Sequence, residues 1–526
     1  MPLHGQNIIG KSTCGKGSDT FRAVDPSTSQ ALETDFHNAT QAEKDQVLAL
    51  ADQAFANRPK DPARTVELLN RCADEIEEVG DELIERCTAE TALPAPRLQG
   101  ERARTCNQLR LFARLVEEGS WIDARIDTAI PDRTPLPKPD MRRMLTPIGP
   151  VLVFGASNFP LAFSVAGGDT ASAFAAGCPV IVKARPAHPG TSELVGQAVQ
   201  KAATAAGMPE GWFAMLHGPG RTTGTYLAKH PVVKAVGFTG SLSGGRALFD
   251  LATSRPDPIP VYAEMGSINP VFLMPEALAE RAEQIADGFY QSVTLGVGQF
   301  CTNPGLVVAI DNEHLEKFVA VLCQHVKQMV PATMLLATIL DSYEQGVQSL
   351  SKAGGVEVAA QARQAPDRDK TQCAAAVFVT DAEKLLDDRS LSHEVFGPST
   401  LIVRCRNTNQ MLEVARHLEG QLTATVHATQ DELDRCGELL ATLETKAGRL
   451  LFGGFPTGLE VCASTHHGGP YPATTDGRST SVGTGAIERF TRAVCYQDFP
   501  QNLLPPQLRD DNPTGIWRLV DGQRTK

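Results

Sequence analysis

The sequence predicts an α/β protein, with a parallel sheet covered by helices on both faces and a second α/β domain after it. The main observation is an alternation of short continuous apolar runs and helix-length segments, first over 148–264 and again over 269–454. Continuous apolar runs are typical of strands buried on both faces, and helical patterns between them indicate βαβ units. The length of 526 residues is sufficient for two or three domains.

The first alternation predicts five strands with helices between them. One helix is expected over 160–176, where Gly177 stops it, and another over 190–206, ended by Gly207. Ligands of such sheets bind beyond the carboxyl ends of the strands. The loops expected to line a site therefore begin at Gly155, Lys183, Gly218, Gly240 and Glu264.

The remaining segments follow from the same patterns. Residues 40–118 are expected to be mostly helical, and the Pro-rich stretch 134–140 to be a linker or an extended arm. In the second alternation, a long helix should run from Pro275 to about Gly298. The chain beyond Pro470 is rich in Gly, Thr and Pro, and is expected to form loops and a tail that pack on their neighbours.

Charge and composition argue against several classes of protein. Lys plus Arg is 49 and Asp plus Glu is 61, which gives a net charge of −12. Without basic runs, the chain is a poor candidate for binding nucleic acid or an anionic membrane. One apolar segment, 150–182, has Asp169 as its single charge, but its Pro and Gly residues and Asn158 favour a buried α/β core over a membrane span.

The cysteines indicate the compartment. Twelve of them lie singly between Cys14 and Cys495, without a CxxC pair or a Cys/His cluster. In so long a chain this scatter fits a reducing compartment and argues against structural zinc. The N-terminus lacks the uninterrupted apolar core of a signal peptide. We therefore expect a cytoplasmic protein with no membrane segment and no metal.

Three short segments carry candidate chemistry. In GQFCTNPG, Cys301 precedes a Pro-Gly turn and is a candidate nucleophile, but a metal ligand, a disulfide partner or a packing residue would give the same pattern. In YAEMGSINP, Glu264 ends an apolar strand and is a candidate general base with a pKa raised by apolar surroundings, or else a salt-bridge or capping residue. In VFGASNFPLAF, Asn158 is a candidate oxyanion donor or an ordinary turn or cap residue.

Two glycine-rich loops are similar to nucleotide-binding motifs but have the wrong spacing. GPGRTTG places Gly224 four residues after Gly220, one more than the dinucleotide fingerprint allows, and GSLSGG at 240–245 fails in the same way. Glycines at strand–helix junctions let the backbone approach a phosphate at a helix N-terminus, or they simply allow tight turns. From these motifs alone both interpretations stay open.

In their order and approximate spacing, the three segments resemble those of the aldehyde dehydrogenase superfamily. EVFGPS at 394–399, Lys183 after PVIV, and GFTGS at 237–241 match further motifs of that superfamily, and the resemblance covers nearly the whole chain. It implies an NAD(P)-binding domain, a catalytic domain and an oligomerisation arm. The implied segments are the N-terminal part of the cofactor-binding domain (1–134), the arm (135–153), the Rossmann-like part (154–266), the catalytic domain (267–470), and a C-terminal return and oligomerisation segment (471–526).

The resemblance also implies a mechanism. The Cys301 thiolate would attack an aldehyde, with the oxyanion held by the Asn158 side chain and the Cys301 backbone N–H. The thiohemiacetal would give a hydride to nicotinamide, and Glu264 would activate the water that hydrolyses the resulting thioester. In the cofactor site, the implied residues are Lys183 for the adenosine ribose or its phosphate, Gly240 and Ser241 for the pyrophosphate, Glu394 for the nicotinamide ribose, and Phe396 beside the ring.

Departures from the superfamily pattern bear on the cofactor and the substrate. No acid follows Lys183 before Glu193, so a 2′-phosphate meets no carboxylate and NADP becomes acceptable beside NAD. Arg221 would stack on adenine or pair with that phosphate, or it is a solvated loop residue. Ser157, where many relatives have tryptophan, and the tail FPTGLEVCASTHHGGPYPATTD resemble the bacterial α-ketoglutarate semialdehyde (2,5-dioxopentanoate) dehydrogenases. A branch acting on fatty aldehydes is similar.

The implied substrate is a small aldehyde with a carboxylate at its far end. Arg104 and Gln108 share one helix face and are candidates for binding it, with a surface role as the alternative for the arginine. Phe159 is expected in the tunnel wall, and family analogy implies a homodimer or homotetramer. A cofactor-independent cysteine hydrolase, with His466 or His467 as base, is a rival from a different class. An acylating dehydrogenase that uses coenzyme A is disfavoured because it needs no water-activating glutamate.

Overall fold

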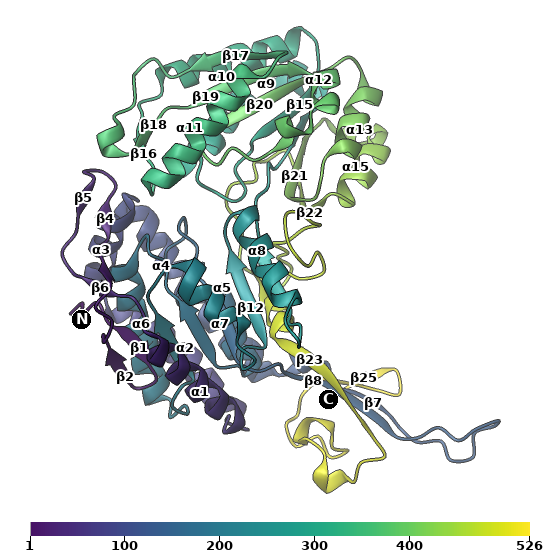
Figure 1. The fold of residues 1–526 in the computed structure, drawn as a ribbon. Coiled ribbons are helices and arrows are strands. Elements are labelled where there is room, and N and C mark those ends of the chain that lie inside the picture. Colours follow the sequence, from purple (N-terminus) through teal and green to yellow (C-terminus); the bar gives the residue numbers. More distant parts are fainter. Residues whose placement is uncertain (1) are drawn as a thin grey trace.

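The computed structural model describes residues 2–526 and has two α/β units with a third, projecting sheet (Figure 1). The lower unit in that view contains most of the first half of the chain. The upper, green unit extends from β14 (Val271–Leu273) to β22 (Ala447–Phe452). The α/β class predicted from the alternating apolar runs is therefore confirmed.

The first unit is built on a seven-stranded sheet in the order β13-β12-β9-β10-β11-β1-β2. The five predicted strands run parallel, whereas two N-terminal strands that were not predicted add antiparallel at one edge. The strands are β1 (Asn7–Ile9), β2 (Ser12–Cys14), β9 (Val151–Phe154), β10 (Val180–Lys183), β11 (Phe213–Leu216), β12 (Ala235–Thr239) and β13 (Val261–Glu264). Consecutive strands β11 and β12 lie on opposite sides of β9, which makes the edge beside β9 a switch point where ligands bind.

Helices pack on both faces of this sheet, including the predicted helical region 40–118. They are α1 (Gln41–Ala56), α2 (Pro62–Glu78), α3 (Asp81–Thr91), α4 (Ala95–Glu118), α5 (Gly168–Ala176), α6 (Pro189–Ala205), α7 (Thr225–Lys229) and α8 (Leu242–Thr253). The apolar residues that α2, α4, α5 and α6 turn inward form one buried cluster with the sheet.

The structure differs from the sequence prediction at α5, which begins at Gly168 and not at residue 160. The backbone N–H groups of Leu161 and Ala162 donate to the buried Glu101 carboxylate on α4, at 2.8 and 3.0 Å. Because a side chain from another helix satisfies these donors, the segment that carries Asn158 turns instead of continuing as a helix.

The second unit is a seven-stranded sheet in the order β17-β19-β20-β15-β14-β21-β22, parallel except for the edge strand β17. Its strands are β14, β15 (Leu306–Ile310), β17 (Val356–Gln361), β19 (Ala376–Asp381), β20 (Ser399–Cys405), β21 (Gln421–His427) and β22. Its helices are α9 (Pro275–Thr294), α10 (Glu313–Gln328), α11 (Ala337–Lys352), α12 (Ala382–Asp387), α13 (Thr408–His417), α14 (Gln430–Arg435) and α15 (Gly437–Glu444).

The long helix predicted before Cys301 is confirmed, with its start at Pro275 and a change of helix type in its last four residues. The α-helix α9 ends at Thr294, and a short turn of 3₁₀ type, η3 (Leu295–Gly298), follows it. Within that turn, Gly296 and Val297 have φ values of +56° and +59°. A left-handed backbone is unusual for a β-branched residue, and here it redirects the chain from the helix towards Cys301.

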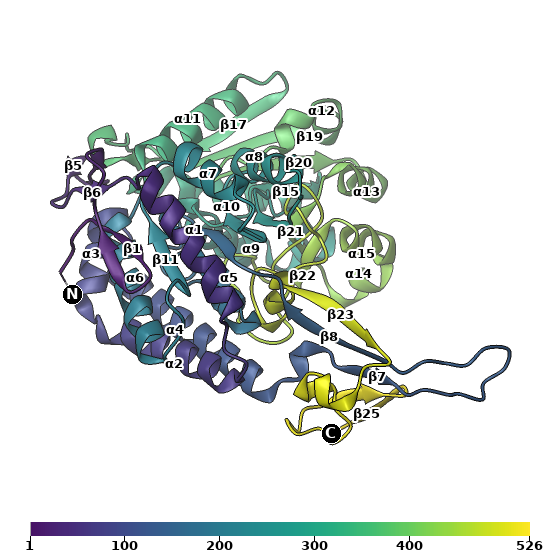
Figure 2. The ribbon, with the colours of Figure 1, turned by 60° about the horizontal axis from the view of Figure 1, so that its bottom comes forward.

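A third sheet, in the order β23-β8-β7-β24-β25, projects away from both units (Figure 2). Its strands are β7 (Arg125–Asp127), β8 (Met141–Pro147), β23 (Thr491–Gln497), β24 (Arg518–Val520) and β25 (Gln523–Thr525). The loop 128–140 extends beyond it and carries the exposed Leu136. Strand β9 of the first unit begins at Val151, inside the segment 135–153 that was assigned to the arm. The domain boundaries drawn from the sequence stay predictions.

Shorter elements complete the chain. Three small pairs of strands are β3 (Thr20–Phe21) with β6 (Phe36–His37), β4 (Val24–Asp25) with β5 (Gln30–Ala31), and β16 (Ala332–Thr333) with β18 (Gln372–Cys373). The remaining short helices are η1 (Ser120–Ile122), η2 (Gly220–Gly224), η4 (Arg368–Lys370), η5 (Arg389–Ser392), η6 (Thr484–Phe490), η7 (Gln501–Leu503) and η8 (Pro506–Leu508). Among the helices of residues 2–526, none is both long and apolar enough to cross a membrane.

After β22 the chain returns to the first unit and lies beside β13. Met265 donates its N–H to the carbonyl oxygen of Ala473 at 2.8 Å, and Thr475 donates to Ala263 at 3.1 Å. These backbone bonds fix the return segment against the carboxyl end of β13. They thereby bring side chains from far along the sequence to Glu264.

Candidate active site

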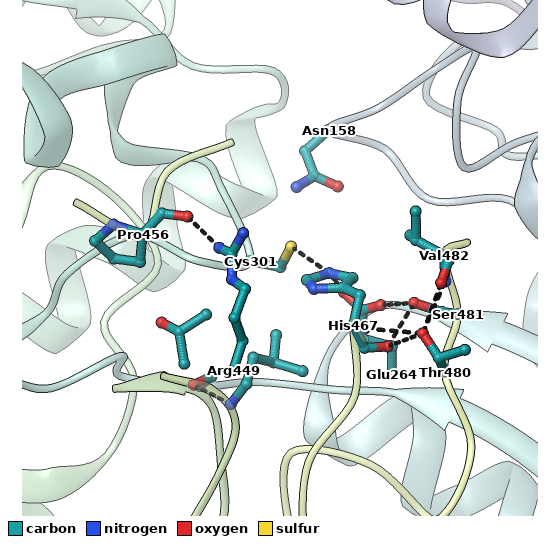
Figure 3. Close-up of polar contacts among 12 residues, drawn as sticks. Asn158, Glu264, Cys301, Arg449, Pro456, His467, Thr480, Ser481 and Val482 are labelled. Carbon is teal, nitrogen blue, oxygen red and sulfur yellow. Dashed lines mark hydrogen bonds and ion pairs between the residues drawn. The ribbon is translucent and has the colours of Figure 1, made fainter. Parts of the chain in front are cut away.

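Cys301 lies where the two units face each other, directly after the turn that ends α9. The Asn269 side chain fixes the backbone there, because its Nδ2 donates to the carbonyl oxygens of Cys301 and Asn303 at 3.0 and 2.9 Å. The half-buried Cys301 Sγ lies 3.5 Å from His467 Nε2 (Figure 3). Burial and the nearby Glu264 carboxylate raise the pKa of this thiol well above its usual value, so the resting group is a neutral thiol.

Glu264 ends β13 and has only 3% of its surface exposed. Its Oε1 lies 3.0 Å from His467 Nε2, and its Oε2 accepts a hydrogen bond of 2.6 Å from Ser481 Oγ. Burial acts to raise the pKa of Glu264, but the charge of His467 and hydrogen bonds from His467, Ser481 and Cys301 outweigh it and hold the pKa below its ordinary value. The predicted rise in this pKa is therefore wrong, because polar side chains and not only apolar ones meet the carboxylate.

His467 is the shared partner of the thiol and the carboxylate. Its side chain is 1% exposed, and one atom, Nε2, faces both Cys301 Sγ and Glu264 Oε1. A proton on Nε2 can be donated to Glu264, and without that proton the same nitrogen can accept the S–H of Cys301. The ring therefore offers one nitrogen through which a proton can pass between the two groups.

Asn158 approaches the thiol from the first unit. It lies in the turn before α5, and in Figure 3 its amide end points towards the Cys301 sulfur. Its Nδ2 donates to the backbone oxygen of Gln299 at 3.1 Å, and the Arg97 guanidinium donates to the backbone carbonyl oxygen of Asn158 at 2.7 Å. The amide is thus fixed beside the nucleophile without a titratable group, as a donor for an oxyanion must be.

Arg104 and Gln108 lie on α4, and Arg104 contacts Phe159, the residue after Asn158. The Arg104 guanidinium lies over the rings of Phe159 and Phe163, with its carbon 5.9 and 5.3 Å from the ring centres. Its buried Nε and Nη2 have no hydrogen-bond partner within residues 2–526. Burial lowers the pKa of Arg104, an effect that the charges of Glu101, Cys301 and Glu264 oppose. Arg104 and Gln108 line a cavity of about 370 Å³ between α4 and residues 459–461.

A second cavity, of about 630 Å³, lies beyond the carboxyl ends of β9 and β10, at the switch point of the first sheet. Lys183 of β10 lines it and is 4% exposed, and its side-chain ammonium group makes no hydrogen bond or ion pair with another described residue. Burial and the charge of Arg185 lower the pKa of Lys183 to about 7. A buried ammonium group without an anion is unfavourable, so a ligand with phosphate or hydroxyl groups fits this cavity.

Gly240 and Ser241, which were predicted to meet the pyrophosphate, lie at the N-terminus of α8. Ser241 is the N-cap, and its Oγ accepts the N–H of Gly244 at 3.2 Å. A Cβ on Gly240 would lie 2.7 Å from the Phe238 ring, so close packing requires glycine there. Ser243 and Gly244 at the start of α8 line the cavity of Lys183, as do Gly220 and Arg221 from GPGRTTG, and the space next to Gly220 is open. The helix N-terminus and both loops therefore surround a place suited to a phosphate.

Glu394 and Phe396 come from the second unit, in the loop before β20. A Cβ on Gly266 would lie 2.5 Å from Glu394 Oε2, so the glycine two residues after Glu264 makes room for this carboxylate. The Glu394 side chain keeps an exposed surface, but desolvation by the protein around it raises its pKa to about 8. Phe396 is half-buried and lines the same small cavity as Glu394.

Sequence reasoning missed several residues of this site. Ser481 and Arg185 carry no motif, and neither does Arg449 of β22, which donates to Pro456 O at 2.7 Å and lies near Cys301 (Figure 3). His467 was considered only as the base of a hydrolase. The signal that could have found it is the His466–His467 pair in a glycine-rich loop.

Fold and site define a class of protein: an α/β enzyme of two units, with a thiol, an imidazole and a carboxylate in contact and a separate cavity lined by cations. The sequence profile of the Aldehyde dehydrogenase family matches residues 14–459. The chain belongs to that family, and the predicted resemblance is confirmed.

Two curated relatives are similar over their full length. The chain is 53% identical to alpha-ketoglutaric semialdehyde dehydrogenase 2 of Azospirillum brasilense, over 99% of this chain and 100% of that protein. It is 46% identical to alpha-ketoglutaric semialdehyde dehydrogenase of Acinetobacter baylyi, over 99% of each. The fold is similar to betaine aldehyde dehydrogenase of Staphylococcus aureus in complex with NAD+, at a TM-score of 0.80 and 19% identity over 95% and 96% of the two chains. PnpE in complex with nicotinamide adenine dinucleotide gives a TM-score of 0.79 and 22% identity over 94% and 97%.

Proposed function

We propose that this protein oxidises 2,5-dioxopentanoate to 2-oxoglutarate with NADP or NAD as the hydride acceptor. The similarity to two alpha-ketoglutaric semialdehyde dehydrogenases over the full chain supports the substrate. The main observation that supports this reaction is that the side chains of Cys301, His467 and Glu264 contact one another next to Asn158 (Figure 3).

The Cys301 thiol is the nucleophile that adds to the aldehyde carbon. Because its pKa is raised, it needs a base at the moment of attack. In the neutral tautomer that carries its proton on Nδ1, His467 Nε2 at 3.5 Å is placed to take the thiol proton, and the Glu264 carboxylate at 3.0 Å stabilises the imidazolium that results. The negative charge that develops on the aldehyde oxygen meets the Asn158 amide and the Cys301 backbone N–H.

The cofactor site is formed by residues of both units. Lys183 holds the adenosine ribose or its phosphate, and Gly240 and Ser241 present the α8 N-terminus to the pyrophosphate. Glu394 holds the nicotinamide ribose and Phe396 packs beside the ring. When bound, the dinucleotide supplies the two-electron acceptor that turns the thiohemiacetal on Cys301 into a thioester.

Hydrolysis of the thioester returns the enzyme to its starting state. The lowered pKa of Glu264 keeps it ionised at neutral pH, so it can accept a proton from the attacking water directly or through His467. Ser481 holds the second carboxylate oxygen at 2.6 Å and thereby fixes the orientation of the base. The presence of this base favours water over coenzyme A as the acyl acceptor.

Arg104 binds the distal carboxylate of the substrate. Two of its buried N–H groups lack partners, and a carboxylate can accept both in a bidentate pair. Gln108 lines the same cavity and is the neutral donor beside it, while Phe159 forms the apolar wall that leads to Cys301. A fatty aldehyde would leave the arginine unpaired, which is why the semialdehyde is the favoured substrate.

NADP is the favoured cofactor of the two. The residues that line the larger cavity include Lys183, Arg185 and Arg221 but neither Asp nor Glu. A 2′-phosphate would therefore meet three cations and no carboxylate, and Arg221 is placed to pair with it or stack on adenine.

The assembly is a cytoplasmic homodimer or homotetramer that forms through the projecting sheet. The loop 128–140 and the C-terminal segment expose several large apolar side chains, which a second copy of the chain would cover. These are Ile130, Leu136, Phe499, Leu503 and Trp517.

A second candidate function, hydrolysis of activated esters without a cofactor, is favoured by the contact between the thiol, imidazole and carboxylate. Ester cleavage at full rate without NAD(P), together with no aldehyde oxidation, would identify this as the main activity.

The test is a comparison of kcat/KM for 2,5-dioxopentanoate, glutaraldehyde and decanal with each cofactor, followed by nicotinamide absorbance. We expect the semialdehyde with NADP to be the best pair. Glutaraldehyde has the same number of carbons but lacks the carboxylate and the 2-oxo group, so it measures what those two groups contribute, including the pairing of the carboxylate with Arg104. A clear preference for decanal would refute the substrate, and no reduction of either cofactor would refute the reaction.

A further inference from the structure

Cys301, His467 and Glu264 together have the composition of a metal site. Their ligating atoms lie within 4.8 Å of one another, and the three residues supply a sulfur, a nitrogen and an oxygen. The Sγ–Nε2 distance is 3.5 Å and the Nε2–Oε1 distance is 3.0 Å. The sequence argued against zinc because no ligand pattern surrounds any cysteine, but His467 and Glu264 reach Cys301 from distant segments.

One of these two distances already matches an edge of a tetrahedron around zinc, and the other is shorter than such an edge. With Zn–S of about 2.3 Å and Zn–N and Zn–O of about 2.1 Å, neighbouring ligand atoms lie about 3.4 to 3.6 Å apart. The sulfur–nitrogen edge is already at that spacing. The nitrogen–oxygen edge needs an increase of about 0.4 Å, which a small rotation of the carboxylate provides.

We propose that Cys301, His467 and Glu264 form a reversible zinc-binding site, and that zinc bound there inhibits the enzyme. Thiolate, imidazole and carboxylate together suit Zn²⁺, and three protein ligands leave the fourth position to water. The inhibition rests on the proposed roles of Cys301 and Glu264, because the ion would occupy both the nucleophile and the base. The binding itself does not depend on those roles.

The surroundings of the ligands make this site reversible and not permanently loaded. Ser481 supports the Glu264 carboxylate with a hydrogen bond of 2.6 Å. By contrast, Nδ1 of His467 has no hydrogen-bond partner among the described residues, although a ligating histidine ordinarily donates its second N–H to an acceptor. Loss of such a partner weakens metal sites by roughly 10- to 100-fold.

Zinc binding releases one proton, because the thiol must become a thiolate before it coordinates the ion and its proton passes to the solvent. The charged groups around the sulfur are Glu264 on β13, Glu394 in the loop before β20, Arg104 on α4 and Arg449 on β22, together with His467.

The experiment is a calorimetric zinc titration of the full chain carrying Cys462→Ser and Cys495→Ser, since these two cysteines are exposed and would bind the ion outside the site. We expect one zinc per chain, binding weakened at least 10-fold by His467→Asn and about 100-fold or more by Cys301→Ser. Glu264→Gln is the third ligand variant. Circular dichroism checks that each variant is folded.

Cobalt(II) in place of zinc gives a readout that does not require turnover. A thiolate-to-cobalt charge-transfer band should appear in the parent protein and be absent in Cys301→Ser. Zinc should inhibit aldehyde oxidation over the same concentration range in which it binds, and EDTA should restore the activity. The proposal is overturned if folded His467→Asn, Glu264→Gln and Cys301→Ser all bind zinc as the parent does, or if the cobalt complex lacks the thiolate band. An inactive parent protein that still binds one zinc would refute the proposed oxidation alone.

Discussion

Replacing His467 with asparagine is the most informative perturbation of the active site. His467 Nε2 is the single atom that meets both Cys301 Sγ, at 3.5 Å, and Glu264 Oε1, at 3.0 Å. Asparagine keeps a polar side chain but cannot take up a proton at neutral pH. The backbone N–H at this position can still donate to Thr480 Oγ1, a bond of 2.8 Å in the structure, so the return segment should stay in place.

The size of the effect follows from the burial of Glu264, which is 3% exposed. Losing a hydrogen bond to a buried charged group costs about 1.5–3 kcal/mol. The pKa of Glu264 should therefore rise, because His467 no longer opposes the effect of burial. Removing the base that accepts the thiol proton should lower the rate by roughly 10²- to 10⁴-fold. We therefore expect a large decrease in kcat/KM. We also expect the acid limb of the pH profile of kcat/KM to move to higher pH.

The assay combines kcat/KM for the semialdehyde as a function of pH with the rate at which iodoacetamide alkylates Cys301, read by mass spectrometry. Alkylation should be slower in His467→Asn because fewer thiols ionise. Ser481→Ala is the matched control, since it removes a bond of 2.6 Å to the other oxygen of Glu264 and leaves the thiol–imidazole contact intact. A variant His467→Asn that alkylates and turns over like the parent at every pH would refute the assigned role.

Three further predictions concern the other groups of the site. Glu264→Gln should let the acyl-enzyme form but block its hydrolysis, giving a burst of reduced cofactor and a covalent adduct in the mass spectrum; a normal steady-state rate would contradict the role of Glu264. Arg104→Gln should raise KM for 2,5-dioxopentanoate roughly 10- to 100-fold, as expected for loss of about 1.5–3 kcal/mol, and should leave KM for decanal unchanged. Arg114→Gln, at the rim of the same cavity, is the control. Equal effects of Arg104→Gln on both substrates would contradict carboxylate binding. Lys183→Met should stabilise the cofactor-free protein by roughly 4–5 kcal/mol at pH 6.5, because burial lowers the pKa of Lys183 from 10.5 to about 7. The stability of the parent should rise between pH 7 and pH 10.5, where only the unfolded chain holds this proton. Denaturant titrations that show no such rise would contradict the unpaired ammonium.

Much of the fold could be predicted because its strands are continuous apolar runs. Each of β9 to β13 is buried over nearly its whole length, so the chemistry of the segment is enough to identify it. The N-terminal pair β1 and β2 was missed because short edge strands carry no such run. The start of α5 was placed too early because the carboxylate of Glu101, distant in sequence, satisfies the backbone donors that a helix would have paired.

The sequence by itself determined which chemical groups reach the site from strand ends and from the turn after α9: Cys301, Glu264, Asn158 and Lys183. Parallel strands end at one edge, so residues that follow them meet there whatever the details of packing. Only the tertiary structure decided that His467, 166 residues beyond Cys301, lies between the thiol and the carboxylate, and that the pKa of Glu264 is lowered. The physical reason is that a pKa depends on charges and donors within a few ångströms, and here those come from a return segment whose position the backbone pairing with β13 sets.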